Sequence, residues 1–165
     1  MDKLFAQRNV ISITRQNDST DYGIGEVINS ATARMLRLKG VTVDNGVPFY
    51  VLRAFILDSA VAAAPAQIQA NFFSREFPIA ADNAAFAPTM QQLAYFLGKI
   101  SMADYSKFNA TTVIFDDVFD PMLMIPEFDS KDVYVVLTAL NAYDPTAYED
   151  LVLVVDTANF LGWVT

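Results

Sequence analysis

The stretches DVYVVLTAL (residues 132–140) and LVLVVD (residues 151–156) decide the fold class of this chain. Both are short runs rich in Val and Leu, bounded by turn residues, which is typical of β-strands. Their apolar residues fall on both faces of the expected strand. We therefore expect both faces of these two strands to be covered.

Further β-rich runs recur upstream, each bounded by turn residues. They cover residues 33–39, 48–58, 67–74, 97–102 and 110–118. In residues 67–74, Gln and Asn alternate with apolar residues, which predicts one wet and one dry face. Asn45-Gly46 is the preferred sequence of a tight hairpin turn.

Few segments favour helix. Residues 90–96 fit one or two helical turns, with Thr89 as the N-cap, after a polar, Ala-rich loop over residues 81–89. Residues 103–109 read as a turn or short helix.

About eight strands with little helix predict an all-β fold, namely a two-sheet antiparallel sandwich that is jelly-roll-like. The sequence has no internal repeat, which argues against a propeller or solenoid. We place the sandwich at residues 30–165 and expect it to associate, with a homotrimer favoured. The apolar side chains expected in its core are Phe55, Leu57, Ile68, Phe72, Val113, Phe115, Val135, Leu137, Leu153 and Val155.

Residues 1–29 differ from the rest and predict an extended N-terminal arm. The alternating run Val10–Thr14 has no obvious partner nearby in the sequence, so it is a candidate for pairing with another chain. The alternative is that this run is the first strand of the sandwich itself. Cationic and apolar side chains of this region, together with the C-terminal tryptophan, are the predicted partner contacts: Leu4, Phe5, Arg8, Val10, Ile11, Ile13, Arg15 and Trp163.

Composition excludes several functions. The chain has 165 residues with no Cys and no His, which removes thiolate and histidine metal sites and His-based catalysis. Its formal net charge is −8, which disfavours binding to nucleic acid. Residues 1–57 hold seven Lys/Arg and five Asp/Glu, against four and fourteen in the remainder. No apolar run reaches the length of a membrane span, and we expect neither a signal peptide nor a membrane partner.

Three acidic clusters are the candidates for chemistry. They comprise Asp116, Asp117 and Asp120; Glu127, Asp129 and Asp132; and Asp144, Glu149 and Asp150. Solvated loops, a Ca²⁺ site and a glycosidase carboxylate pair are the three interpretations. None matches a specific motif, so we predict no catalytic residue, no metal site and no cofactor. The aromatic residues, thirteen Phe, seven Tyr and one Trp, are expected mainly in the core.

A succession of segments resembles a family of small structural proteins from tailed bacteriophages. The segments are FILD (55–58), QIQANFF (67–73), ADNAAF (81–86), LGKI (97–100), ADYSKF (103–108), Thr112-Val113 and LVLVVD (151–156). Their order and spacing carry the resemblance over about residues 50–156, and residues 1–29 are not covered.

The resemblance implies a non-enzymatic virion component on the capsid exterior. We predict a capsid decoration, or cement, protein whose partners are the major capsid protein and other copies of itself. One alternative is a head-fibre or tail adaptor that binds host surface glycans. Another is a glycosidase acting on the host envelope.

Overall fold

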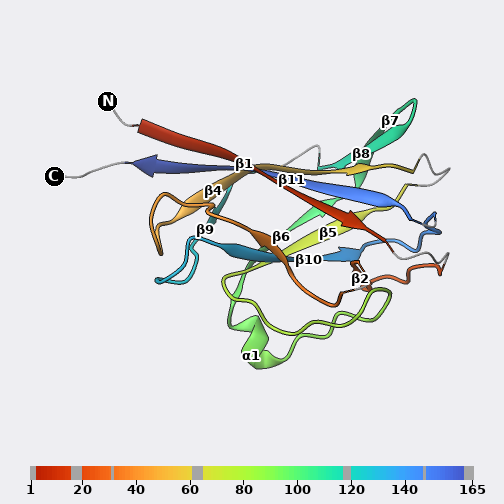
Figure 1. Ribbon diagram of the computed structural model, residues 1–165, viewed down its shortest axis with the longest axis horizontal. Helices are drawn as coiled ribbons and strands as arrows, with labels where there is room; N and C mark the ends of the chain where they lie inside the picture. Colours follow the sequence, from red (N-terminus) through yellow and green to blue (C-terminus); the bar gives the residue numbers. More distant parts are fainter. Residues whose placement is uncertain are drawn as a thin grey trace.

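A computed structural model describes residues 3–15, 20–30, 32–60, 65–116, 120–146 and 148–161, with the backbone alone for residues 3–5, 160 and 161. Two antiparallel sheets pack face to face in this structure (Figure 1). The predicted all-β sandwich is therefore confirmed.

The larger sheet runs in the order β1 (Lys3–Thr14), β11 (Asp150–Leu161), β4 (Phe49–Asp58), β8 (Thr111–Phe115) and β7 (Asp104–Phe108), and β9 (Met122–Met124) also pairs with β4. The smaller sheet runs in the order β2 (Val27–Ile28), β10 (Val133–Ala139), β5 (Ile68–Phe73) and β6 (Phe96–Met102), and β3 (Leu36–Leu38) also pairs with β10.

The strands pair in a nested order from the two ends of the chain inward. β1 pairs with β11, β2 and β3 pair with β10, β4 pairs with β8, and β5 pairs with β6. This is the order of one long hairpin rolled into two facing sheets, which is a jelly roll. β7 extends the roll as a hairpin on β8.

The first strand belongs to the sandwich. β1 pairs with β11 in unbroken register from Lys3↔Leu161 to Thr14↔Asp150. The alternative in which Val10–Thr14 forms the first strand of the domain is thus the one that the structure shows. The partner of β1 is β11, which is more than 130 residues away in the sequence, so the sequence next to β1 does not reveal it.

The core lies between the sheets, and six of the expected side chains are buried there: Ile68, Phe72, Val135, Leu137, Leu153 and Val155. Four expected core residues are instead half-buried on the outer face of the larger sheet: Phe55, Leu57, Val113 and Phe115. Their neighbours Ala54, Ile56 and Ile114 fill the core. The expectation was wrong by one residue on β4 and β8, and a one-residue slip exchanges the faces of a strand.

The outer face of the smaller sheet has its own apolar layer, formed by the segment of residues 74–95. Phe73 on β5 packs edge-on against Phe77, with ring centroids 4.9 Å apart, and against Phe86 at 6.1 Å. The short helix α1 (Met90–Leu93) lies in this cover (Figure 1). Thr89 caps it as predicted.

Three local predictions need correction. The expected wet face of residues 67–74 is only partly exposed: Gln67 and Gln69 are half-buried, and Asn71 is buried, donating to the Val136 carbonyl at 3.2 Å. Residues 104–108 form strand β7 rather than a turn or helix. Asn45-Gly46 is a turn, with Gly46 at φ 68°, but it links β3 and β4, which lie in different sheets.

Candidate interaction surface

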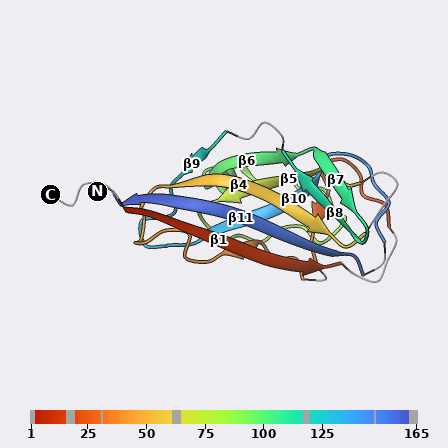
Figure 2. The same cartoon turned by 90° about the horizontal axis from the view of Figure 1, so that it is seen from above.

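The outer face of the larger sheet carries apolar side chains and forms what we call the open face. Its members lie on β1, β11, β4 and β8: Val10, Leu52, Phe55, Leu57, Val113, Phe115, Val152 and Val154. Val10 is 57% exposed and Leu52 is 40% exposed, whereas Val154 between the two strands is only 4% exposed. No described segment is laid over this face in the way that residues 74–95 cover the smaller sheet (Figure 2).

Strand register aligns these side chains in rows across the sheet. One row runs from Val10 through Val154 to Phe55. The next row runs from Val152 through Leu57 to Val113. Apolar neighbours in such cross-strand rows form a continuous surface, because facing side chains lie about 5 Å apart.

A β-bulge on β4 adds that strand's residues to the open face. The register between β4 and β11 shifts at Asp156/Thr157, so that Leu52 is left over between Val51↔Thr157 and Arg53↔Asp156. Leu52 and Arg53 are therefore both exposed in succession. Beyond the bulge the alternation is inverted, and this turns Phe55 and Leu57 outward.

A charged triad borders the apolar rows. Arg8 donates to Asp156 at 2.7 and 3.0 Å, and Arg53 donates to the same carboxylate at 2.8 and 3.1 Å. The hydrogen bond from Arg8, with that from Arg53, holds the pKa of Asp156 below its usual range. Because two cations share one anion, this border is net positive on an acidic protein.

A shallow apolar groove of about 270 Å³ lies on the open face. Phe55, Val113 and Phe115 line it, with Arg53 and Asp116 at its margin. The Arg53 guanidinium lies 5.0 Å from the centre of the Phe55 ring. The groove offers apolar contact with a charged rim, which is how protein interfaces are built.

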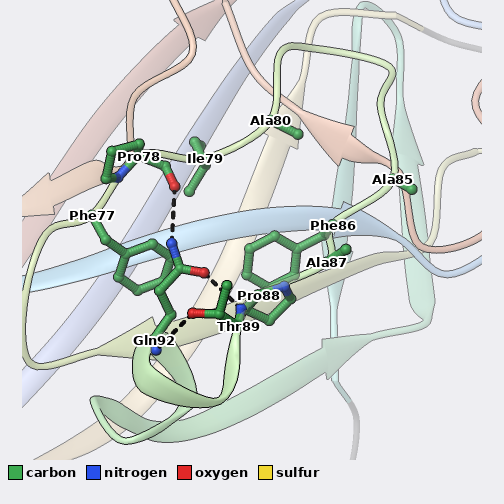
Figure 3. Close-up of a pocket in the computed structure, with 10 residues that line it drawn as sticks. All are labelled: Phe77, Pro78, Ile79, Ala80, Ala85, Phe86, Ala87, Pro88, Thr89 and Gln92. Atoms are coloured by element: carbon green, nitrogen blue, oxygen red, sulfur yellow. Dashed lines mark hydrogen bonds between the residues drawn. The ribbon is translucent and has the colours of Figure 1, made fainter.

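The hollow drawn in Figure 3 has a different character. About 350 Å³ in volume, it is lined by the cover segment, including Phe77, Phe86 and Gln92. The Gln92 amide is already engaged, donating to the Pro78 carbonyl at 3.3 Å and accepting from the Thr89 N–H at 2.7 Å. No titratable side chain lines the hollow, so it supplies no acid or base.

A buried polar cluster joins the ends of β1, β4 and β11. Arg15, 2% exposed, donates to the Tyr22 hydroxyl at 2.6 Å, and that hydroxyl donates to Asp82 at 2.7 Å. The Tyr22 ring stacks on Tyr143, with centroids 4.9 Å apart. Glu149, 2% exposed, lies 3.9 Å from the Arg15 guanidinium.

Two carboxyl groups of this cluster share a hydrogen bond, Asp58 and Glu149. Burial raises both pKa values, and together with the hydrogen bond to Asp58 it raises the pKa of Glu149 to about 8. Asp58 is only 1% exposed and Glu149 only 2%, so a substrate does not reach them. The pair holds the strand ends together and is not a candidate for catalysis.

Of the other predicted acidic residues that the structure describes, Asp150 begins β11 and the rest lie in loops. Asp132 pairs with Arg37, and Glu127 lies 3.6 Å from Arg75. Asp117 lies outside the described residues. Within the described part of the chain, no group of three acidic side chains is placed to hold a metal ion.

One acidic loop does combine charge with an exposed aromatic ring. Phe128, 82% exposed, stands between Glu127 and Asp129. A polar hollow of about 340 Å³ lies beside it, lined in part by Arg75, Glu127 and Asp129.

The predicted contact residues differ in where they lie and in how far they are exposed. Val10 and Arg8 are exposed on the open face and its border. Ile11 is half-buried, and Ile13 and Arg15 are buried within the chain. The side chains of Leu4 and Phe5, and Trp163 as a whole, lie outside the described part of the structure.

No protein-family model and no curated protein matches this chain. In the described residues, no helix has the length and apolar character needed to cross a membrane.

Proposed function

We propose that this chain is a non-enzymatic virion protein of a tailed bacteriophage that binds the major capsid protein from the outside and stabilises the head. The observation that carries the binding role is the open face, an apolar sheet surface flanked by Arg8 and Arg53. The phage setting rests on the resemblance over residues 50–156. The positive border favours an acidic patch of the shell as the contact.

The asymmetry between the two outer faces supports this function. The chain covers the smaller sheet with Phe77, Ile79 and Phe86, whereas Leu52 and Val10 of the larger sheet stay exposed. An extended apolar patch on a protein surface marks an interaction site.

Binding to shells tests the proposal. Purified protein is mixed with expanded shells that lack it, and the bound fraction is measured by co-sedimentation. Leu52→Glu places a charge on the open face and is expected to lower binding at least about tenfold. Met90→Glu, at an 85% exposed position on α1, is the matched control and should bind like the natural chain. Equal binding by both variants contradicts docking through the open face.

Copy number tests the decoration role separately. Mass spectrometry of purified particles should find on the order of hundreds of copies, as the repeated sites of a symmetric shell require. A few copies per particle would instead place the protein at a unique position.

A second candidate is the glycan-binding adaptor, which Phe128 favours. An exposed ring between two carboxylates is suited to stacking on a sugar while the carboxylates accept its hydroxyl hydrogen bonds. Binding to a glycan array that is lost in Phe128→Ala would support it, and an array without signal would remove it.

A further inference from the structure

β1 forms a long free edge of the larger sheet. Among the described strands it lies at the end of the strand order, with β11 on one side only (Figure 2). Its pairing with β11 is continuous over all twelve residues. Residues 6–14 contain no proline, and no bulge interrupts them. Such a strand is a template for pairing with another strand.

One hydrogen bond identifies which backbone groups face the free edge. The Arg15 N–H donates to the Glu149 carbonyl at 3.0 Å, next to the pair Thr14↔Asp150. Hydrogen-bonded pairs alternate in an antiparallel ladder, so odd-numbered residues of β1 bond to β11. The even-numbered residues from Ala6 to Thr14 therefore direct their N–H and C=O groups outward.

The side chains on this edge do not block pairing with another strand. Natural edge strands often carry charged side chains that block pairing. Arg8 is the one charged residue from Ala6 to Thr14, and both of its hydrogen bonds run back to Asp156 of its own sheet. Val10, at the middle of this stretch, is 57% exposed and apolar.

We propose that β1 pairs antiparallel with β1 of a second copy about a two-fold axis at Val10, which joins the two larger sheets into one. This register places Val10 opposite the second copy's Val10, Arg8 opposite Ser12, and Ala6 opposite Thr14. All are even-numbered, so both edges offer matching donors and acceptors. No like charges face each other.

The same register extends an existing apolar row. Phe55, Val154 and Val10 already align across the sheet. At the two-fold axis this row meets its own copy through the two Val10 side chains, which buries the most exposed member of the row. The self-complementary sequence and this continuity favour a second copy over an unrelated strand. An isologous edge contact gives a dimer, in place of the trimer that composition favoured.

Crosslinking tests the register. The chain has no Cys, so Val10→Cys introduces a unique thiol. Two such thiols lie on strand positions about 5.5 Å apart across the axis. Ser12→Cys is the matched control, on the same edge and face, but its two copies are four residues out of register, about 14 Å apart. A short thiol crosslinker should link Val10→Cys into dimers at least about tenfold faster than Ser12→Cys. Equal rates, or no dimer from either, overturn the proposal.

Sedimentation of the natural chain and two variants completes the test. The natural chain and Val10→Thr, which keeps the β-branched shape, should sediment as dimers. Val10→Lys brings like charges together at the axis and should weaken association at least about tenfold, with an unchanged circular dichroism spectrum. A monomeric or trimeric natural chain overturns the proposal. Leu52→Glu should stay dimeric, so loss of shell binding and loss of pairing are separate results.

Discussion

The buried carboxyl pair should make this domain lose stability as the pH rises. Burial raises the pKa of Glu149 from 4.5 to about 8 in the folded state. The folded state therefore holds a proton that the unfolded chain releases near pH 4.5. Stability falls wherever the folded state binds more protons. We expect the free energy of unfolding to decrease between about pH 4.5 and pH 8 and then to level off.

The size of the effect follows from this interval. Each pKa unit between 4.5 and about 8 corresponds to about 1.4 kcal/mol of unfolding free energy. The free energy of unfolding therefore decreases by at most roughly 5 kcal/mol over this interval. Arg15, at 3.9 Å, opposes it by stabilising the Glu149 carboxylate. The titratable and charged groups around Glu149 are Arg15, Tyr143, Asp58 and the exposed Asp150. Domains of this size are stable by about 5–15 kcal/mol, so the change is measurable.

Urea unfolding between pH 5 and pH 9, followed by far-ultraviolet circular dichroism, measures this dependence. Glu149→Gln removes the ionisation and keeps an amide that can donate to Asp58. It should flatten the pH dependence and be at least as stable as the natural chain at pH 9. Glu76→Gln, at an exposed position, is the control and should keep the natural slope. A natural chain whose stability is constant or rises from pH 5 to pH 8 refutes the reasoning.

Three substitutions and one deletion follow from burial and register, each measured by chemical unfolding. Val135→Asp should unfold the domain, because Val135 is 0% exposed in the apolar core and the substitution buries an unpaired carboxylate there. Ile56→Ala, in the core, should cost about 2–5 kcal/mol, whereas Phe55→Ala, on the open face, should cost clearly less; the reverse order would contradict the register of β4. Removal of residues 1–20 should prevent folding, since it deletes β1 and the buried Ile13, and a folded truncated chain would show that β1 is dispensable.

Local patterns in the sequence predicted most of the strands. β4, β5, β8 and β10 fall within the expected runs, because Val, Ile and Phe between turn residues are a local signal. β6 begins one residue before its expected run, and β11 extends five residues beyond its own. β9 has only three residues, follows Pro121 directly and lies outside every expected run. β7 is exposed on both faces, so it lacks the alternation that marks a strand.

Pairing between distant residues is what local inspection missed. The partner of Val10 is Val154, at the other end of the chain. The cluster around Arg15 likewise assembles Tyr22, Asp82 and Glu149 from separate loops. The sequence does indicate that Arg15 is buried, because Arg15 continues the alternation of Ile11 and Ile13 and so lies on the same face of the strand. It does not indicate which acidic residues pair with Arg15.

The open face was misassigned for a reason that bears on function. Phe55 and Leu57 were expected inside because large apolar side chains usually are. Arg53 carried the contrary signal, since an exposed charge two residues before Phe55 places Phe55 on the same outer side. The bulge at Leu52 reconciles the inward Val51 with the outward Arg53. Bulges reorient side chains at functional sites. The bulge thus turns Phe55 outward, in the cross-strand row that ends with Val10 on the edge strand β1.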